Sequence, residues 1–408
     1  MLIQLAYKSL LSRKGSVIMT VLAISVSVMV LLGVEHVRQQ TRDNFSNTVS
    51  GVDLVVGART GSLNLLLYSV FRIGNPTNNI QWSSYQTIAN SKSVAWAVPM
   101  SLGDSHKGYR VLGTSQSYFE HFRYGKKHPL EFSAGVSFSA LYDVVLGSQV
   151  AAKLGYQLGD QITLSHGVAA TSFSQHKDSP FKVVGILKPT GTPVDQTVHV
   201  SLAAIEAIHW NWQPGAKRGA VSEQDLPPGA LEPKEITAMM LGLKSRMAVF
   251  KLQRNINQFK GEPLTAILPG VALTELWHMM GMLENSLRAI SALVLLSALL
   301  GLAAVLMTSI RERKPELALL RMMGASPWWL LALILIEIAL ISLTAIVLGI
   351  ATLYLLMNSL ADLLTAEFGL RISTELTDLL QPELLGTVMA SSLFVALVAF
   401  VLSRWRSA

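Results

Sequence analysis

Four long apolar runs constrain this chain more than any other feature of its sequence. They cover residues 16–34, 284–310, 328–357 and 384–403. A helix needs about 20 apolar residues to cross the hydrocarbon core of a bilayer, and each run is about that long or longer. Residues 35–283, between the first and second runs, read as an ordinary globular sequence. The chain is therefore predicted to span a membrane four times and to carry one large domain.

Composition agrees with this plan and excludes several classes of protein. Half of the residues are apolar (50%) and only 14% are charged, which is too hydrophobic for an ordinary soluble enzyme. The net charge of +7 could indicate nucleic acid, but much of the basic excess lies beside the apolar runs, where topology explains it. We therefore expect no nucleic acid partner. The absence of cysteine excludes disulfides, thiolate chemistry and Cys-ligated metals.

The N-terminal segment is predicted to lie on the cytoplasmic side. Lys8, Arg13 and Lys14 precede the first apolar run, and such positive flanks remain inside. Residues 1–15 have the pattern of a cytoplasmic amphipathic helix in the membrane interface, although they could equally be a plain positive flank of the span. Residues 16–34 are longer than the apolar part of a usual signal peptide, and no clear cleavage site follows. We expect a retained first span.

The charges around the later spans extend the same argument. Residues 358–383 carry five carboxylates against the single base Arg371, whereas the tail at 404–408 is basic. This asymmetry predicts a short outer loop at 358–383 and places residues 311–327 and 404–408 in the cytoplasm. The large domain, residues 35–283, is then extracytoplasmic.

The large domain is predicted to have a mixed α+β fold, inserted between the first and second transmembrane helices. Short apolar runs bounded by turn residues recur through it, together with segments of helical period. Its last part, 272–286, is helical in period and continues without a Pro into the second span, which predicts a stalk. Residues 63–73 are unusually apolar for an extracytoplasmic surface. They are either a buried core helix or a substrate or partner contact made by Leu65, Leu66, Leu67, Tyr68 and Phe71.

A charged strip, residues 311–327, separates the second and third apolar runs. Pro315 suits the first turn of a helix, and Gly324 stands where a helix C-cap would fall. A plain positive-inside loop would need basic residues but no helical order. The spacing of Glu316 and Arg321 within this strip therefore favours a cytoplasmic helix that couples the chain to another protein.

The strip resembles a motif of the FtsX/MacB-type permeases of ABC transporters, a family that includes the LolC and LolE lipoprotein-release subunits. The family pattern is E-R-K-x-E-I-A-[IL]-L-R-A-[LM]-G-A, and the matching residues are Glu312, Arg313, Lys314, Glu316, Leu317, Ala318, Leu320, Arg321, Gly324 and Ala325. A second match lies at residues 145–160 and 181–187, which are similar to the family's G-x-x-x-A-x-x-L-G-x-x-x-G-D and f-x-V-V-G-I-l segments. With the four-span plan, the resemblance covers nearly the whole chain.

The resemblance implies a membrane subunit without catalytic residues. Members of the family that are only a permease do not hydrolyse ATP, and this sequence contains neither G-x-x-x-x-G-K-[ST] nor an LSGGQ-type signature. ATP and Mg are therefore expected in a separate ABC ATPase subunit, and no cofactor is expected on this chain. The ATPase-coupling residues that the resemblance implies are Arg311, Glu312, Arg313, Lys314, Glu316, Leu317, Leu320, Arg321 and Gly324.

The resemblance also implies partners, a location and a function. The expected partners are a second permease copy (in a homodimer or a heterodimer with a paralogue), membrane lipids, and a periplasmic adaptor or lipoprotein. The expected location is the inner membrane of a bacterial cell, with the large domain periplasmic. The implied function is mechanotransmission by an ATP-driven ABC transporter acting on a lipid-linked or amphiphilic substrate such as a lipoprotein, lipid, peptide or drug. The alternative is a transmembrane signalling scaffold that activates a periplasmic cell-wall hydrolase or another partner on ATP hydrolysis.

Glu337 and the histidines are polar residues that could have a function of their own. Glu337 lies inside the third apolar run, about two to three turns from its cytoplasmic end. A carboxylate in a membrane is costly and suggests function, and we expect it to couple neighbouring helices rather than to relay protons. The nine histidines match no spacing of metal ligands, so no metal site is expected.

Overall fold

The computed structural model divides the chain into two compact units. The membrane unit comprises Met1–Thr41, Gly281–Leu363 and Ile372–Ala408, and the core unit comprises Arg42–Met280 and Leu364–Arg371. The residues that the structure describes are 2–48, 50–166, 179–210, 212–213, 216–217, 229–312, 319, 322–368 and 375–405.

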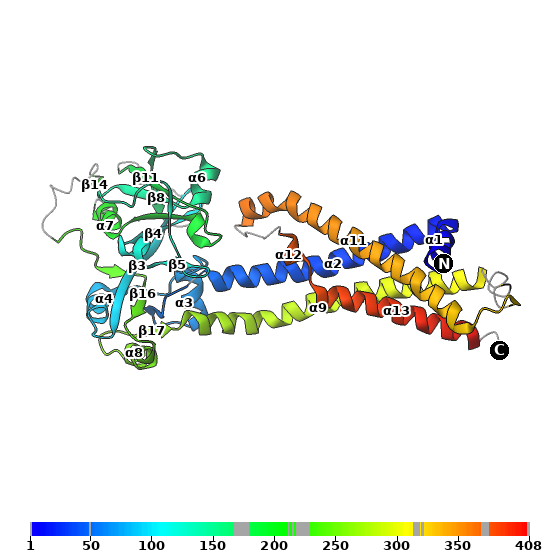
Figure 1. The fold of residues 1–408 in the computed structure, drawn as a ribbon. Helices are drawn as coiled ribbons and strands as arrows, with labels where there is room; N and C mark the ends of the chain where they lie inside the picture. Colours follow the sequence, from blue (N-terminus) through cyan, green and yellow to red (C-terminus); the bar gives the residue numbers. More distant parts are fainter. Residues whose placement is uncertain are drawn as a thin grey trace. The chain divides into compact units, whose positions relative to one another are not determined.

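Long helices make up the membrane unit, as the apolar runs predict (Figure 1). Its helices are α1 (Leu2–Ser12), α2 (Lys14–Asn47), α9 (Pro269–Glu312), α11 (Pro327–Phe368), α12 (Leu376–Leu379) and α13 (Pro382–Trp405). Four of them, α2, α9, α11 and α13, are long and apolar enough to cross a membrane. The prediction of four transmembrane helices with a large mixed domain between the first and the second is confirmed.

Two helices extend beyond the spans expected from hydropathy. Helix α9 is a single element of 44 residues that includes both the predicted stalk and the second span. Helix α11 continues to Phe368, through part of the stretch that was expected to be a loop. Residues 358–368 contain neither Gly nor Pro, so no residue type in this stretch breaks the helix where the apolar run ends.

The first and third spans pack closely at Gly349 of α11. A Cβ added there would lie 2.9 Å from the backbone oxygen of Ser25 and 2.9 Å from Cγ1 of Val28, both on α2. Gly33 of α2 is close to Leu353 in the same contact, at 3.2 Å from an added Cβ to its Cδ1. Small residues allow membrane helices to approach in this way. This contact holds α2 against α11 and so helps to position the polar residues of both helices.

A mixed sheet forms the middle of the core unit. Its strands follow the order β17-β1-β16-β3-β4-β12-β8-β11-β7, with β10 beside β3 and β9 beside β11. Pairs β4–β12 and β8–β11 are parallel, and the other pairs are antiparallel. The strands are β1 (Leu54–Ala58), β3 (Val94–His106), β4 (Tyr109–Thr114), β7 (Phe132–Gly135), β8 (Asp143–Leu146), β9 (Gln161–Ile162), β10 (Ser165–His166), β11 (Phe181–Leu187), β12 (Thr197–Ser201), β16 (Ala238–Leu243) and β17 (Leu264–Ile267).

Helices and short hairpins cover this sheet. The helices are α3 (Ser62–Ser69), α4 (Trp82–Ala89), α5 (Ser117–His121), α6 (Ser148–Leu154), α7 (Leu202–Trp210) and α8 (Val249–Asn257), with the 3-10 turns η1 (Pro193–Gln196) and η3 (Arg246–Ala248). The strand pairs outside the sheet are β2 (Ile80–Gln81) with β15 (Glu235–Ile236), β5 (Arg123–Tyr124) with β6 (His128–Pro129), and β13 (Trp212–Gln213) with β14 (Ala216–Lys217).

Alternating side chains of the central strands build a core on each face of the sheet. On β1, Leu54 and Val56 pack with α4 and α8, whereas Val55 packs with α3 on the opposite face. This is the two-residue period of a strand that is buried on both sides. A third cluster packs α6 and α7 on strands β4, β8, β11 and β12.

The chain enters and leaves the sheet by neighbouring strands. β1 is the first strand after α2, and β17 is the last strand before α9. They pair antiparallel, with Val55 opposite Ile267. The two connections to the membrane helices therefore start at the same end of one strand pair.

Candidate functional site

The coupling segment between α9 and α11 lies only partly within the described residues. Arg311 and Glu312 are exposed at the C-terminal end of α9. Gly324 adopts φ +94°, a conformation that suits glycine, in the turn before α11. The other predicted coupling residues lie outside the described part of the chain: Arg313, Lys314, Glu316, Leu317, Leu320 and Arg321.

Glu337 forms a buried contact between the N-terminal segment and the third span. It is only 4% exposed on α11. Its Oε2 lies 3.7 Å from Nη2 of Arg13, the residue between α1 and α2. The same guanidinium nitrogen lies 3.4 Å from the hydroxyl of Ser9 on α1. One arginine thus joins the turn between the first two helices to the interior of the third span. We call this contact the inner pair.

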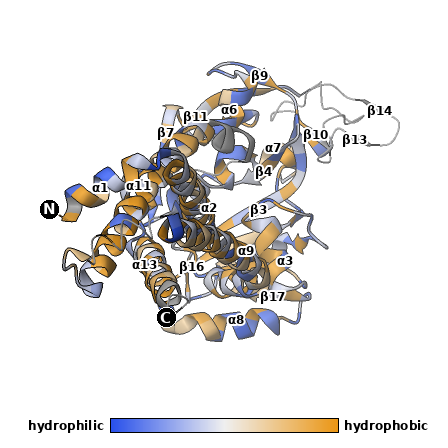
Figure 2. Ribbon diagram, turned by 90° about the vertical axis from the view of Figure 1, so that its right-hand side faces the viewer, coloured by the Kyte–Doolittle hydropathy of each residue, from blue (hydrophilic) through white to orange (hydrophobic). Residues whose placement is uncertain are grey.

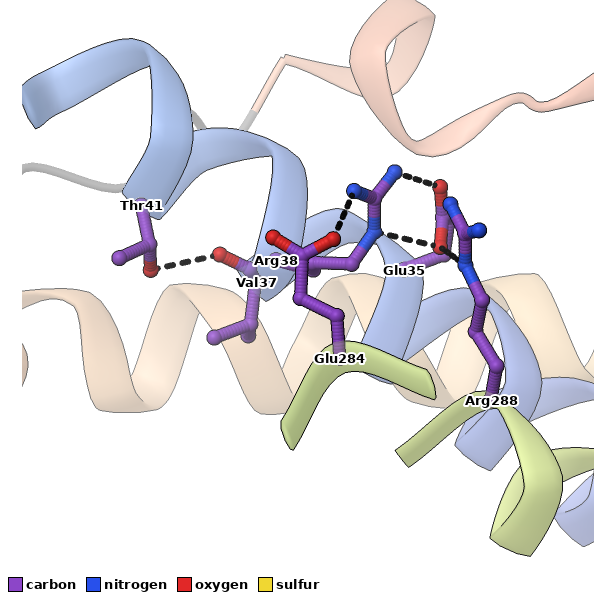
Figure 3. Close-up of polar contacts among 6 residues, drawn as sticks. All are labelled: Glu35, Val37, Arg38, Thr41, Glu284 and Arg288. Carbon is purple, nitrogen blue, oxygen red and sulfur yellow. Dashed lines mark hydrogen bonds and ion pairs between the residues drawn. The ribbon is translucent and has the colours of Figure 1, made fainter. Parts of the chain in front are cut away.

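A second charged group links α2 and α9 (Figure 3). Arg38 of α2 donates from Nε to Oε2 of Glu35 at 2.9 Å and from Nη2 to Oε1 of the same carboxylate. Its Nη1 donates to Oε2 of Glu284 on α9 at 3.0 Å. Nε of Arg288 on α9 lies 3.9 Å from Oε2 of Glu35. We call these four residues the outer cluster.

The outer cluster is an alternating chain of charges in which Arg38 has the central position. Its side chain is 13% exposed, and those of its partners Glu35 and Glu284 are 23% and 19% exposed. A planar guanidinium that binds two carboxylates is geometrically specific, and partial burial strengthens each hydrogen bond. The arrangement fixes α2 to α9 where the first apolar run ends and the second begins, so one helix cannot slide along the other without breaking these bonds.

The sequence predicted that Glu337 couples neighbouring helices but did not identify Arg13 as its partner, and it did not predict the outer cluster, although signals for that cluster exist. Glu35 and Arg38 are three residues apart, and Glu284 and Arg288 are four residues apart, so each pair lies on one helix face. Both pairs stand at the outer end of an apolar run. Arg13 was interpreted only as a topological charge, because nothing in a single sequence shows that it lies beside Glu337.

The apolar segment between residues 63 and 73 is part of the core. Leu65 and Leu66 of α3 are fully buried, and Tyr68 and Phe71 are 1% and 5% exposed. Leu67 is partly buried against the same cluster. This placement corresponds to the buried core helix, the first of the two interpretations, and does not present these side chains as a surface for substrate.

The membrane unit has an apolar cavity of about 830 Å³ along α11. Val347, Ile350, Ala351 and Tyr354 recur on one face of the helix, as the helical period requires. Three further residues, which are both polar and apolar, line the cavity beside α11. The lining residues there are Glu375, Thr377 and Leu380.

The core unit buries two ionisable rings that are neutral, those of His199 and Tyr118. His199 on β12 is fully buried, and its Nδ1 lies 3.3 Å from the backbone oxygen of Val145. Burial lowers the pKa of His199 to about 3, so the ring is neutral. The ring of Tyr118 lies 5.5 Å from it between centroids, and burial raises the pKa of this phenol to about 12. Within the described residues, no group of three His, Asp or Glu side chains could hold a metal ion.

Comparisons with known proteins assign both parts of the chain. Residues 17–256 match the family described as "MacB-like periplasmic core domain", and residues 288–408 match "FtsX-like permease C-terminal". A comparison with curated proteins found no match.

Two solved structures are similar to the chain at low sequence identity. The periplasmic region of MacB from Actinobacillus actinomycetemcomitans is 12% identical, with a TM-score of 0.34, over 56% of this chain and 94% of that one. The extracellular domain of the noncanonic ABC-type transporter YknZ from Gram-positive bacteria is 13% identical, with a TM-score of 0.31, over 53% and 98%. The match to the periplasmic core domain covers more than half of the chain, and the permease match covers three of the four candidate spans. The chain is therefore an ABC transporter permease of the FtsX/MacB type.

Proposed function

We propose that this chain is the permease subunit of an ATP-driven ABC transporter that works by mechanotransmission in a bacterial inner membrane. A separate ABC ATPase subunit binds ATP and Mg, and its closure moves the coupling segment. The substrate is lipid-linked or amphiphilic and is handled on the periplasmic side. Two permease copies work together, as a homodimer or with a paralogue.

One observation carries this proposal: a single helix connects the sheet to the coupling segment. Helix α9 begins at Pro269, directly after β17, and ends at Glu312, the first residue of the family motif. Displacement of the cytoplasmic end is therefore transmitted through backbone hydrogen bonds rather than through a loop. The outer cluster transmits the displacement from α9 to α2, because Arg38 of α2 binds both Glu284 of α9 and Glu35 of α2.

Two further features support the class of substrate and the assembly. The cavity along α11 combines apolar walls with the carboxylate of Glu375, which suits an amphiphile with a polar head. On α9, Ser297, Gly301 and Ala304 are exposed at helical spacing, which allows a second copy to pack closely.

The coupling step is tested with the full chain and its ATPase in proteoliposomes. Glu316→Lys reverses one charge of the family motif and should abolish most of the ATPase stimulation by the permease. Glu383→Lys, the same reversal in the first turn of α13, is the matched control and should leave stimulation intact. Equal stimulation in both variants would refute the proposal.

The transmission step is tested at the outer cluster. Arg38→Glu should leave ATP hydrolysis unchanged and stop release of the substrate, since the helices are no longer linked. The double change Arg38→Glu with Glu284→Arg restores opposite charges on α2 and α9 and should recover part of the release. Co-purification of an enzyme in place of a lipidated cargo would favour the signalling alternative.

A further inference from the structure

Helix α8 of the core unit has two faces of different character. Val249, Leu252 and Ile256 are buried and pack in the cluster with β1, β16 and β17. The outward face carries two large apolar side chains: Met247 of the preceding turn is 92% exposed, and Phe250 is 70% exposed. Met247 lies in the 3-10 turn that leads into α8, and Phe250 is the second residue of the helix, so the two exposed side chains are close in sequence at its N-terminal end. Figures 1 and 2 show α8 at the periphery of this unit.

The charge around these two side chains has one sign. Residues 244–260 contain five cations and no carboxylate. All five are exposed, and none forms an ion pair with a carboxylate in the described part of the chain. They are Lys244, Arg246, Lys251, Arg254 and Lys260. This short stretch therefore carries five positive charges with no negative one, far in sequence from the positive flanks of the spans.

We propose that this face of α8 is a docking surface for an acidic segment of another protein, which covers Met247 and Phe250 with apolar side chains. Uncompensated cations favour a partner of opposite charge and raise its rate of association. Exposed Met and aromatic residues beside arginines have the composition of a protein interface, in which a few buried anchors supply most of the affinity. This surface lies outside the coupling segment, the inner pair and the outer cluster.

The apolar area of the face distinguishes a protein from a lipid surface. Membrane binding by a surface helix scales with the apolar area that enters the interface. The wide apolar stripe of α8 is already used against the sheet, and only Met247 and Phe250 remain exposed for a partner. Two anchors are enough for a hot spot in a protein interface but form a small footprint for a bilayer.

Photocrosslinking of the full-length chain in cells of the source organism tests the proposal. A benzophenone amino acid is placed at position 247 or 250, and for comparison at Ser83, an exposed position on α4. We expect adducts at 247 and 250 with a protein whose crosslinked peptide is rich in Asp and Glu, and no such adduct at 83. Arg246→Glu with Arg254→Glu should lower the yield about tenfold, since it reverses two charges beside the anchors.

Matched controls define what overturns the proposal. Lys126→Glu reverses an exposed cation elsewhere on the core unit and should not change the yield. The thermal unfolding of all variants should match the wild type, because each substituted side chain is exposed. Four results would each refute an acidic protein partner. They are adducts with lipid alone, adducts with a second copy alone, a yield that does not change on charge reversal, and no adduct above the Ser83 control.

Discussion

Glu337 of the membrane unit and His199 of the core unit are both buried, but they differ in their charged neighbours. In the membrane unit, Glu337 is 4% exposed and lies beside the guanidinium of Arg13 from another helix. In the core unit, His199 is fully buried and neutral, because burial and the nearby guanidinium of Arg72 lower its pKa to about 3. A buried charge needs a partner, whereas a buried neutral group needs only a hydrogen bond. The ion pair of Glu337 with Arg13 links distant parts of the chain, whereas the neutral ring of His199 only stabilises the fold of the core unit.

Breaking the inner pair should have the largest effect. Glu337→Ala leaves Arg13 without its carboxylate in a mostly buried place, and we expect a loss of about 3 kcal/mol in the free energy of unfolding. Arg13→Met with Glu337→Met removes both charges and should recover much of this loss. Chemical unfolding in mixed micelles measures both variants. If the double variant is as unstable as the single one, the charge pairing does not explain the contact.

The neutral histidine should make the core unit sensitive to acid. The pKa of His199 falls from 6.5 in the unfolded chain to about 3 in the folded chain. Between these two pH values the unfolded chain binds a proton at this ring and the folded chain does not. Stability contributed by this group is complete above pH 6.5 and should fall by up to about 1.4 kcal/mol per pH unit as the pH drops towards 3. Hydrogen exchange of the β12 amides in the full chain reports the change.

His199→Asn provides the control for this pH dependence. The amide can replace Nδ1 as the donor to Val145, but it does not titrate. The variant should therefore show a flatter loss of protection between pH 6.5 and pH 4, whatever its stability at neutral pH. The same slope in both proteins would place the acid sensitivity elsewhere.

Substitutions in the outer cluster should lower the free energy of unfolding by an intermediate amount. Arg38→Ala removes three hydrogen bonds to partly exposed carboxylates, and we expect a loss of about 1 kcal/mol. The side chain of Arg288 is 55% exposed, and its Nε lies 3.9 Å from Oε2 of Glu35. Arg288→Ala should therefore lower the free energy of unfolding by less than about 0.5 kcal/mol. Thermal unfolding of the two variants gives the ranking, and the reverse order would contradict the central position of Arg38.

The smallest effect is expected at an exposed pair of the core unit. Nζ of Lys188 lies 2.7 Å from Oε2 of Glu131, with side chains 55% and 56% exposed. Solvent screens such a pair, so Lys188→Ala should leave Tm unchanged within error in a scan at physiological salt. A clear fall in Tm would show that short distance alone, without burial, makes a contact important in this protein.

Sequence reasoning found what depends on local pattern and missed what depends on distant contacts. The four spans follow from apolar length, and the family motif follows from the residues between 311 and 327. The order of the strands in the sheet does not follow from local pattern, because β1 pairs with strands that lie about two hundred residues further along the chain. Arg13 could not be predicted as the partner of Glu337 for the same reason, since the two residues are distant in sequence. Residues 63–73 were ambiguous because an apolar helical period describes a core helix and an exposed apolar contact equally well.

The pairing of β1 with β17 has a consequence for how such proteins diversify. Residues facing each other across an antiparallel ladder are about 5 Å apart, so Val55 and Ile267 bring the entry and exit of the chain together. A segment with adjacent ends can be replaced by another without moving what it is attached to. The stretch from β1 to β17 therefore has the geometry of an exchangeable segment, and a relative's domain that is grafted at these two strands should fold.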